Sequence, residues 1–494
     1  MLGLSRSGEG AARLASHLGY HVWLSDAGEN TPEKEALAEA LHALPNVRIE
    51  TNGHSEAWFT SVQHVIVSPG IPPHAPLLQR LHQQGITTET DVSFALRHSP
   101  AGLRWVGITG SNGKSTVTQL LTHLLTQLGC PAVACGNVGV SVAKVMLNLL
   151  QSSPLPTALP VLVMELSSYQ LHHSPTLATS EGVGVEVAIF TNLTPDHLQW
   201  HGSYDAYAQA KQRLFFNTPA PKVVLLNQQD AQGQAWLQQL SHVGQNVQGF
   251  GQSLNPTAPF PQWIVGETQI HYHANADAPP MMLAELAHWL LLGSHNRENL
   301  VACIAAVAAL GVYPLKRQPP PAEQDRLHQA MACFGGVEHR LEPVSHPWGI
   351  RCFNDSKATN PEAAMTALHA VHGYPAVVCL AGGLDKETPL DAWATLMKAT
   401  CHHVVLYGRC AERFYHALLV AGFDAQQLVC VATLTEAYQQ ALAWLQTTPT
   451  LKGSRCAEAV LLLSPAAASQ DQFADFEERG RHFKTLVEKT SFLS

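Results

Sequence analysis

The chain contains 494 residues, of which 46% are hydrophobic and 14% are charged, and its net charge is -9 at pH 7. This length is too great for one hydrophobic core and indicates about three domains. The acidic balance argues against broad nucleic-acid or membrane-surface binding, which needs a basic face. The 10 cysteines form no CxxC pair, and the apolar runs are too short for a bilayer span. We therefore expect a soluble cytoplasmic monomer with reduced thiols.

Two turn-rich stretches divide the chain into three segments. They are RHSPAGLR around Pro100 and the Pro-rich KRQPPPAEQD from Lys316. Each segment alternates apolar runs with amphipathic helices, which predicts an α/β fold with parallel sheets. The predicted domains are a Rossmann-like domain over residues 1–98, a central P-loop ATPase-type domain over 99–318 and a second Rossmann-like domain over 319–494.

The first segment opens with MLGLSRSGEGAARLASHLGYHVWLSD, which predicts a Gly-rich turn, a helix and a strand that ends at Asp26. This is a variant of the dinucleotide-binding motif, with Ser5 where the second glycine usually stands. Later, HVIVSPGIP ends a strand in the turn Ser68-Pro69-Gly70, at the position where such sheets bind ligands. A purely structural βαβ unit explains the first pattern equally well.

Only Met1 and Leu2 precede Gly3 in this motif, although a full buried strand normally stands there. Without that strand, the predicted sheet has a gap or an unpaired edge near its ligand crevice. We expect that the start codon has been assigned too late or that the chain has been trimmed. An upstream in-frame run of about five apolar residues, a typical strand length, would settle this.

The second segment contains a candidate phosphate-binding loop in GITGSNGKSTVTQLL. The usual loop needs a glycine where Ile108 stands, so Gly110 makes this one shorter. A β run precedes the loop and a helix follows it, so that free amides and the helix dipole converge on a phosphate. Lys114 is expected at the outer phosphates and Ser115 at Mg²⁺. The alternative is a plain turn before a helix with an exposed lysine.

Three further residues could work with this loop. Glu165 ends the apolar strand in VLVMELSSYQL, where a carboxylate is costly unless it is paired or binds a metal. His197 follows a strand and Lys211 lies on a predicted helix. Taken alone, Glu165 could also be an exposed strand end, His197 a turn residue and Lys211 a solvated charge.

Seven motifs together resemble one family, the Mur ligases, ATP-dependent amide-forming enzymes of peptidoglycan synthesis. They are GSNGKST, ELSSYQ, NLTPDHLQWHGSYDAYAQAK, GSHNRENL, FGGVEHRLE, NDSKATNPEA and LSPAAASQDQFADFEERG. The resemblance covers essentially the whole chain, and the short loop is this family's form. It implies that ATP phosphorylates a carboxylate and that an amine attacks the acyl phosphate to give an amide, ADP and phosphate.

The resemblance also implies the roles of individual residues at the ATP site. It implies two Mg²⁺ ions, one on Ser115 and Glu165 and one near His197 and a CO₂-derived carbamate on Lys211. The implied catalytic residues are Lys114, Glu165, His197, Lys211 and Arg340. The implied ATP contacts are Gly110, Ser111, Asn112, Gly113, Lys114, Ser115, Thr116, Asn296, Asn299, Arg340 and Asp355.

The carboxylate substrate and the amine are implied in the same way. The motifs NDSKATNP and SPAAASQDQF are most similar to the branch that adds D-glutamate to UDP-N-acetylmuramoyl-L-alanine. The implied UDP-substrate contacts are Ser5, Ser7, Gly8, Asp26, Ser68, Pro69, Gly70 and Asn137. The implied D-glutamate contacts are Thr359, Lys386, Ser469 and Phe476. Ser5, and Gln470 where the family commonly has leucine, depart from the pattern.

Other readings differ in the amine or in the class of protein. A sister Mur ligase or a folylpolyglutamate synthase shares the central ATPase and takes a different acceptor. A nucleotide-regulated binding module is disfavoured because it needs no second metal site. A dehydrogenase is disfavoured because the dinucleotide motif is imperfect and the phosphate loop lies in the middle segment.

Overall fold

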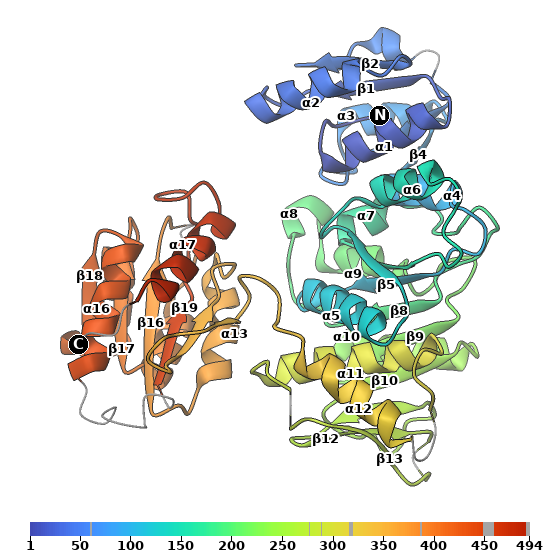
Figure 1. Ribbon diagram of the computed structural model, residues 1–494. Coiled ribbons are helices and arrows are strands. Elements are labelled where there is room, and N and C mark those ends of the chain that lie inside the picture. Colours follow the sequence, from blue (N-terminus) through green and yellow to red (C-terminus); the bar gives the residue numbers. More distant parts are fainter. Residues whose placement is uncertain are drawn as a thin grey trace. The chain divides into compact units, whose positions relative to one another are not determined.

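The computed structural model describes residues 1–59, 62–275, 277–287, 289–315, 320–385, 388–447 and 459–490. The chain forms two compact units (Figure 1). The first comprises Met1–Trp289 and Glu298–Ala332, and the second Leu290–Arg297 and Cys333–Ser494. Among the described residues, no helix combines the length and the apolar character needed to cross a membrane. The three domain boundaries given above stay predictions.

The N-terminal part of the first unit alternates strands and helices. Strands β1 and β2 pair in parallel, as do β3 and β4. Leu2 forms a parallel bridge to Ser25 and another to Val67 and thereby joins the two pairs. The elements are α1 (Arg6–His17), β1 (Val22–Asp26), α2 (Pro32–His42), β2 (Val47–Thr51), β3 (His64–Ile66), α3 (Pro76–Gln83), β4 (Thr87–Glu89) and α4 (Asp91–Arg97).

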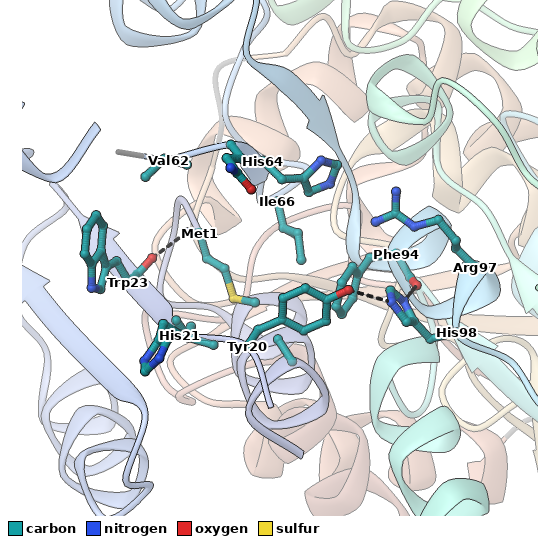
Figure 2. Close-up of a pocket in the computed structure, with 13 residues that line it drawn as sticks. Met1, Tyr20, His21, Trp23, Val62, His64, Ile66, Phe94, Arg97 and His98 are labelled. Atoms are coloured by element: carbon teal, nitrogen blue, oxygen red, sulfur yellow. Dashed lines mark hydrogen bonds between the residues drawn. The ribbon is translucent and has the colours of Figure 1, made fainter. Parts of the chain in front are cut away.

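Residues of β1 and β3 line a groove that also contacts Met1 (Figure 2). Its volume is about 710 Å³. The backbone nitrogen of Met1 donates a hydrogen bond to the Trp23 carbonyl at its inner end, and burial lowers the pKa of that amino group to about 5. Among the described residues, β1 pairs with β2 and β3 pairs with β4, and β1 and β3 do not pair with each other; the missing strand stays a prediction. The lining includes Met1, Val22, Trp23, His64, Ile66 and Phe94.

The larger part of the first unit is built on one mixed sheet with the order β13–β12–β11–β10–β9–β8–β5–β7–β6. The strands from β6 to β11 run parallel, whereas β12 and β13 are antiparallel additions at one edge. The bounds are β5 (Trp105–Thr109), β6 (Ala132–Gly136), β7 (Val161–Glu165), β8 (Val187–Phe190), β9 (Val223–Asn227), β10 (Val247–Gly251), β11 (Gln262–Val265), β12 (Gln269–His273) and β13 (Met281–Glu285).

Strands β5, β7 and β8 are buried along their whole length, as expected for parallel strands covered on both faces. Ile108 on β5 pairs with Glu165 on β7, and Thr109 pairs with Phe190 on β8. Three carboxyl ends of strands therefore meet at one sheet edge. The helices of this part are α5 (Lys114–Gln127), α6 (Val142–Gln151), α7 (Ser168–His173), α8 (Leu198–His201), α9 (Tyr204–Gln212), α10 (Ala231–His242), α11 (Ser294–Ala309) and α12 (Pro321–Ala332).

The second unit holds a sheet with the order β14–β15–β19–β16–β17–β18, parallel except for β14. Helices pack on both faces, and apolar clusters lie on each side of the central strands. The elements are β14 (Glu342–Val344), β15 (Arg351–Asn354), α13 (Pro361–Val371), β16 (Ala376–Gly382), α14 (Asp391–Thr400), β17 (His403–Tyr407), α15 (Ala411–Val420), β18 (Leu428–Val431), α16 (Leu434–Thr447), β19 (Ala459–Leu463) and α17 (Phe476–Glu488).

Candidate active site

The phosphate loop connects β5 to α5 and depends on two glycines. Gly110 has φ 149° and Gly113 has φ 83°, backbone conformations that residues with a side chain rarely adopt. A Cβ on Gly110 would lie 2.0 Å from Thr191 Oγ1, and one on Gly113 would lie 2.7 Å from Asn299 Oδ1. Because α5 begins at Lys114 directly after the loop, its first amides and the positive end of its dipole point toward the loop.

A neighbouring segment after β8 holds the loop in shape. Ser111 N donates to the Asn192 carbonyl at 2.8 Å, and Asn112 N donates to Asn192 Oδ1 at 2.9 Å. Ser111 Oγ bonds to the Thr194 carbonyl at 3.0 Å and lies 2.9 Å from the Tyr207 hydroxyl. These supporting residues were not predicted, although the polar run TNLT directly after a buried strand was a signal for them.

Glu165 lies at the carboxyl end of β7 and is 2% exposed. Its Oε1 accepts a hydrogen bond from Asn137 Nδ2 at 2.8 Å, whereas no described residue bonds to its buried Oε2. A buried carboxylate oxygen without a partner is costly, and a hard cation such as Mg²⁺ satisfies it. Within the described part of the chain, no group of three or more His, Cys, Asp or Glu forms a metal site. Glu165 therefore fits Mg²⁺ only together with other oxygen ligands, such as Ser115 and phosphate.

Lys211, on α9, is almost completely buried, with 1% of its surface exposed. Its Nζ donates to the Gly110 carbonyl at 2.7 Å and lies 4.6 Å from the centre of the Tyr207 ring. Burial, followed by the charge of Lys114, lowers the pKa of Lys211 well below its ordinary value. An uncharged amine is nucleophilic, so the site favours the form of lysine that reacts with CO₂.

Lys114 contacts the same loop. Its Nζ donates to the Gly110 and Ser111 carbonyls at 2.9 and 2.8 Å. The Gly110 carbonyl thus accepts from both lysines, which places Lys211 beside the phosphate loop. The structure therefore brings Lys114, Lys211 and Gly110 together.

His197 occupies a left-handed turn immediately before α8, with φ 55°. Asp196 Oδ1 accepts from the backbone N of His197 at 2.8 Å, and Asp196 Oδ2 lies 3.3 Å from the ring Nε2. Burial lowers the pKa of His197, Asp196 raises it, and Lys211 and Lys114 lower it further. Tyr169 packs on the ring at 4.8 Å. A mainly neutral, half-exposed imidazole can act as a ligand or a hydrogen-bond donor.

The predicted UDP-substrate residues of the first unit gather at the amino end of α1. Ser5 caps this helix by accepting from Gly8 N at 3.4 Å, and its Oγ lies 3.1 Å from Ser68 Oγ in the second turn. Gly8 admits no side chain because a Cβ would lie 2.1 Å from the Gly3 carbonyl. The two turns predicted separately are therefore adjacent, with Ser7 on α1 and Pro69 and Gly70 following Ser68.

The side chains of Asp26 and Asn137 both have hydrogen-bond partners within the chain. Asp26 accepts from Leu4 N at 2.6 Å, from Gly28 N at 2.8 Å and from Lys34 Nζ at 2.9 Å. Although burial opposes it, these hydrogen bonds and Lys34 hold the pKa of Asp26 below its usual value. Asn137 supports Glu165 through its side chain, and Arg6 donates to the Asn137 carbonyl at 2.9 Å. Asp26 thus stabilises the Gly-rich turn at Leu4, and Asn137 links Glu165 to Arg6 at the start of α1.

The second unit carries the predicted Arg340 in a strained turn. His339 and Leu341 on either side have φ 65° and 43°, a left-handed conformation that is costly for such residues and is found at functional sites. Asp355 accepts from Leu341 N at 3.2 Å and from Ser464 Oγ at 2.9 Å. Burial raises the pKa of Asp355 to about 7, and Arg340 opposes this rise. Arg340 and Asp355 therefore act on each other at one end of β15.

The predicted asparagines lie on α11. Asn296 belongs to the second unit and donates through Nδ2 to the Leu292 carbonyl at 2.7 Å. Asn299 belongs to the first unit. It packs against Gly113 of the phosphate loop, because a Cβ on Gly113 would lie 2.7 Å from Asn299 Oδ1. The structure thus places Asn299 at the loop.

Three of the four predicted D-glutamate residues lie on segments that one buried arginine joins in the second unit. Arg479 is 0% exposed and donates to the Ser356 carbonyl at 2.8 Å and to the Ala467 and Ala468 carbonyls at 3.0 and 3.2 Å. These bonds tie the loops that carry Thr359 and Ser469 to the helix that begins at Phe476. No described residue bonds to the buried Ser469 Oγ. Gln470 is exposed, and Lys386 lies outside the described residues.

Comparison with known proteins identifies the family. Three family models match the chain: the Mur ligase MurD-like N-terminal domain at residues 1–89, the Mur ligase middle domain at 108–307 and the Mur ligase glutamate ligase domain at 339–455. A UDP-N-acetylmuramoylalanine–D-glutamate ligase of Parasynechococcus marenigrum (strain WH8102) is 35% identical over 508 residues, covering 99% of this chain and 97% of that one. The enzyme of that name from Desulfitobacterium hafniense (strain Y51) is 32% identical over 492 residues, with 99% and 97% covered.

Solved structures agree on the fold. The UDP-N-acetylmuramate-alanine ligase MurC of Thermotoga maritima has a TM-score of 0.52 at 18% identity and covers 99% of both chains. The MurF ligase of Thermotoga maritima, in complex with ADP, has a TM-score of 0.55 at 12% identity and covers 99% of this chain and 98% of that one. The predicted three-domain α/β fold is confirmed, and the chain belongs to the Mur ligase family.

Proposed function

We propose that the chain is an ATP-dependent ligase that joins D-glutamate to UDP-N-acetylmuramoyl-L-alanine and releases ADP and phosphate. The observation that carries this proposal is the phosphate loop with the buried amine of Lys211 and with Glu165 Oε2, to which no described residue bonds. The choice of D-glutamate is supported by near full-length relatives that carry that name. The cytoplasmic location and the monomeric state stay predictions.

Each residue at the loop would have its own role in the phosphoryl transfer. The loop amides from Gly110 to Thr116 and Lys114 would hold the phosphates. Ser115 and Glu165 would hold one Mg²⁺, with His197 and a carbamate on Lys211 as ligands of a second. Bound there, Mg²⁺ would neutralise the charge of the transferred group. The carbamate would convert a buried amine into an anion that can bind a cation.

The remaining substrate groups are assigned as proposals in the same way. The turns at Ser5–Gly8 and Ser68–Gly70 would offer amides to the UDP part. Arg340 and Asp355 would contact ATP together with Asn296 and Asn299, Arg340 because its guanidinium stays charged and presents a fork of donors. Ser469, whose hydroxyl bonds to no described residue, would contact D-glutamate together with Thr359, Phe476 and Lys386.

An assay of phosphate release tests this proposal. The purified chain is given ATP, Mg²⁺, UDP-N-acetylmuramoyl-L-alanine and, in turn, D-glutamate, L-glutamate, L-alanine, a diamino acid and D-alanyl-D-alanine. Turnover with D-glutamate alone is expected. Turnover only with another amine would assign the chain to a sister ligase, and no turnover with any amine would refute the ligase assignment.

A further inference from the structure

The Ser68–Gly70 turn is held by two side chains that belong to the central sheet's helices. Trp200, on α8, donates through Nε1 to the Gly70 carbonyl at 3.3 Å. His173, at the end of α7, bonds through Nε2 to the Ile71 carbonyl at 2.9 Å. Consecutive carbonyls of one turn therefore bind side chains from two helices that follow different strands. These two bonds add to those that Ser68 makes with Leu2 and Ser5, and they are the ones that reach the turn from the helices after β7 and β8.

The two donors are connected to His197 by aromatic rings in contact with one another. Tyr169 packs on His197 at 4.8 Å and on Trp200 at 4.6 Å. Trp200 in turn lies 5.6 Å from His173 in an edge-to-face arrangement. Such ring pairs contribute beyond the area that they bury. Because α8 contains only Leu198–His201, the position of Trp200 on the turn also sets where His197 sits.

The histidines around Trp200 are in a charge state that suits a role in holding two parts of the site at a fixed distance. Burial, which outweighs the bond to the Ile71 carbonyl, lowers the pKa of His173, and burial with neighbouring charges lowers the pKa of His172 and of His201 to about 4. The groups that face these rings are Arg213, Lys211, His82 and His197. The rings are therefore mainly neutral near pH 7, so that His173 can donate from Nε2 and His201 adds no positive charge near Lys211.

We propose that Trp200 and His173 are positioning residues that fix the Ser68–Gly70 turn at a set distance from His197. On the proposed function, on which this inference rests, the turn binds the UDP end of the substrate and His197 lies near its reacting carboxylate. The two contacts then set the length between the site that recognises the substrate and the site that activates it. A misplacement of about 1 Å at such a site costs about a hundredfold in rate.

Two substitutions of Trp200 separate its hydrogen bond from its ring. Trp200→Phe keeps a ring on Tyr169 and removes the donor to Gly70, so we expect KM for UDP-N-acetylmuramoyl-L-alanine to rise about 2- to 12-fold, the worth of one hydrogen bond, with kcat little changed. Trp200→Leu also removes the ring that fixes α8, so kcat should fall as well. In Trp200→Phe, KM for ATP should stay at its wild-type value, and the melting temperature should fall by only about 2–4 °C for each kcal/mol lost.

Trp444→Phe is the matched control. Trp444 also donates one indole hydrogen bond, to Gln427 Oε1 at 3.2 Å, and also stacks on a histidine, His403, at 5.0 Å, but it lies in the second unit. Its kinetics should match the wild type. His173→Gln, whose amide can replace Nε2, should recover most of the activity that His173→Leu loses.

The outcomes separate this inference from the proposed function. An active wild type whose Trp200→Phe and Trp200→Leu variants keep the wild-type KM and kcat would overturn the inference alone. Equal rises in KM for ATP and for the UDP substrate would also overturn it, because a general loss of structure explains them. A wild type without turnover would overturn the proposed function first.

Discussion

Replacing Lys211 by methionine should abolish turnover while leaving the fold intact. Methionine fills nearly the same volume and cannot form a carbamate. The change removes one hydrogen bond to the Gly110 carbonyl, worth about 0.5–1.5 kcal/mol, but that carbonyl keeps Lys114 Nζ at 2.9 Å. It also removes the burial cost of a polar amine, which offsets part of the loss.

The free energy of unfolding should therefore change by less than about 1 kcal/mol, and the melting temperature by less than about 4 °C. The rate should fall by at least about 10²–10³-fold, the usual effect of removing one preorganised charged group. Phosphate release and thermal unfolding measure the two quantities. Lys222→Met is the matched control, because that lysine is 63% exposed and pairs with Glu186 at 3.6 Å.

Two results would refute this reasoning. A fully active Lys211→Met variant would exclude any role of the carbamate, and a large drop in melting temperature would show that the amine is structural. As a direct check, ¹³C-labelled bicarbonate should give a carbamate NMR signal in the wild type and none in Lys211→Met. Short carboxylic acids should partly restore Lys211→Ala.

The other predictions use the same assays. Gly113→Ala should raise KM for ATP and lower stability by at least about 1–2 kcal/mol, the cost of a left-handed alanine, whereas Gly102→Ala, with φ 75° and no atom within 4 Å of its Cβ, should lower stability only; equal effects on KM would contradict this. Ser469→Ala should leave the melting temperature unchanged or higher, because it removes a buried hydroxyl without a described partner, and should raise KM for D-glutamate; an unchanged KM would remove Ser469 from the site. Because the folded-state pKa values of His172 and His201 are lowered to about 4, the unfolded chain binds more protons between about pH 6.5 and 4, so stability should fall as the pH drops through this range. His172→Gln should reduce that fall in a series of thermal unfolding curves, and an identical slope would contradict the assigned cause.

Local sequence patterns predicted the parts of the site that follow strands. Lys114 and Glu165 stand at the carboxyl ends of apolar runs, and parallel strands place those ends at one edge, so their proximity follows from the order of the elements alone. Lys211 did not follow from any local pattern, because a lysine on a helix is usually solvated. Its predicted role came only from the resemblance. Its burial and its hydrogen bond to the Gly110 carbonyl are visible only in the folded structure.

The contacts of Asn192, Tyr169 and Arg479 could not be predicted, since each depends on how segments distant in the sequence pack. Asn192 binds a loop about 80 positions earlier in the chain, and Arg479 binds Ser356, 123 positions away. No periodicity reports such pairs. Asp26 shows the opposite case: its position after β1 pointed to a ligand, whereas its oxygens are engaged by the turn itself.

The groove between β1 and β3 leaves backbone amides and carbonyls of two strands facing an open channel. Edges of this kind accept extended polypeptide with little regard to its side chains. An extended peptide added in excess can therefore pair along the edge of β1 or of β3 that faces this groove.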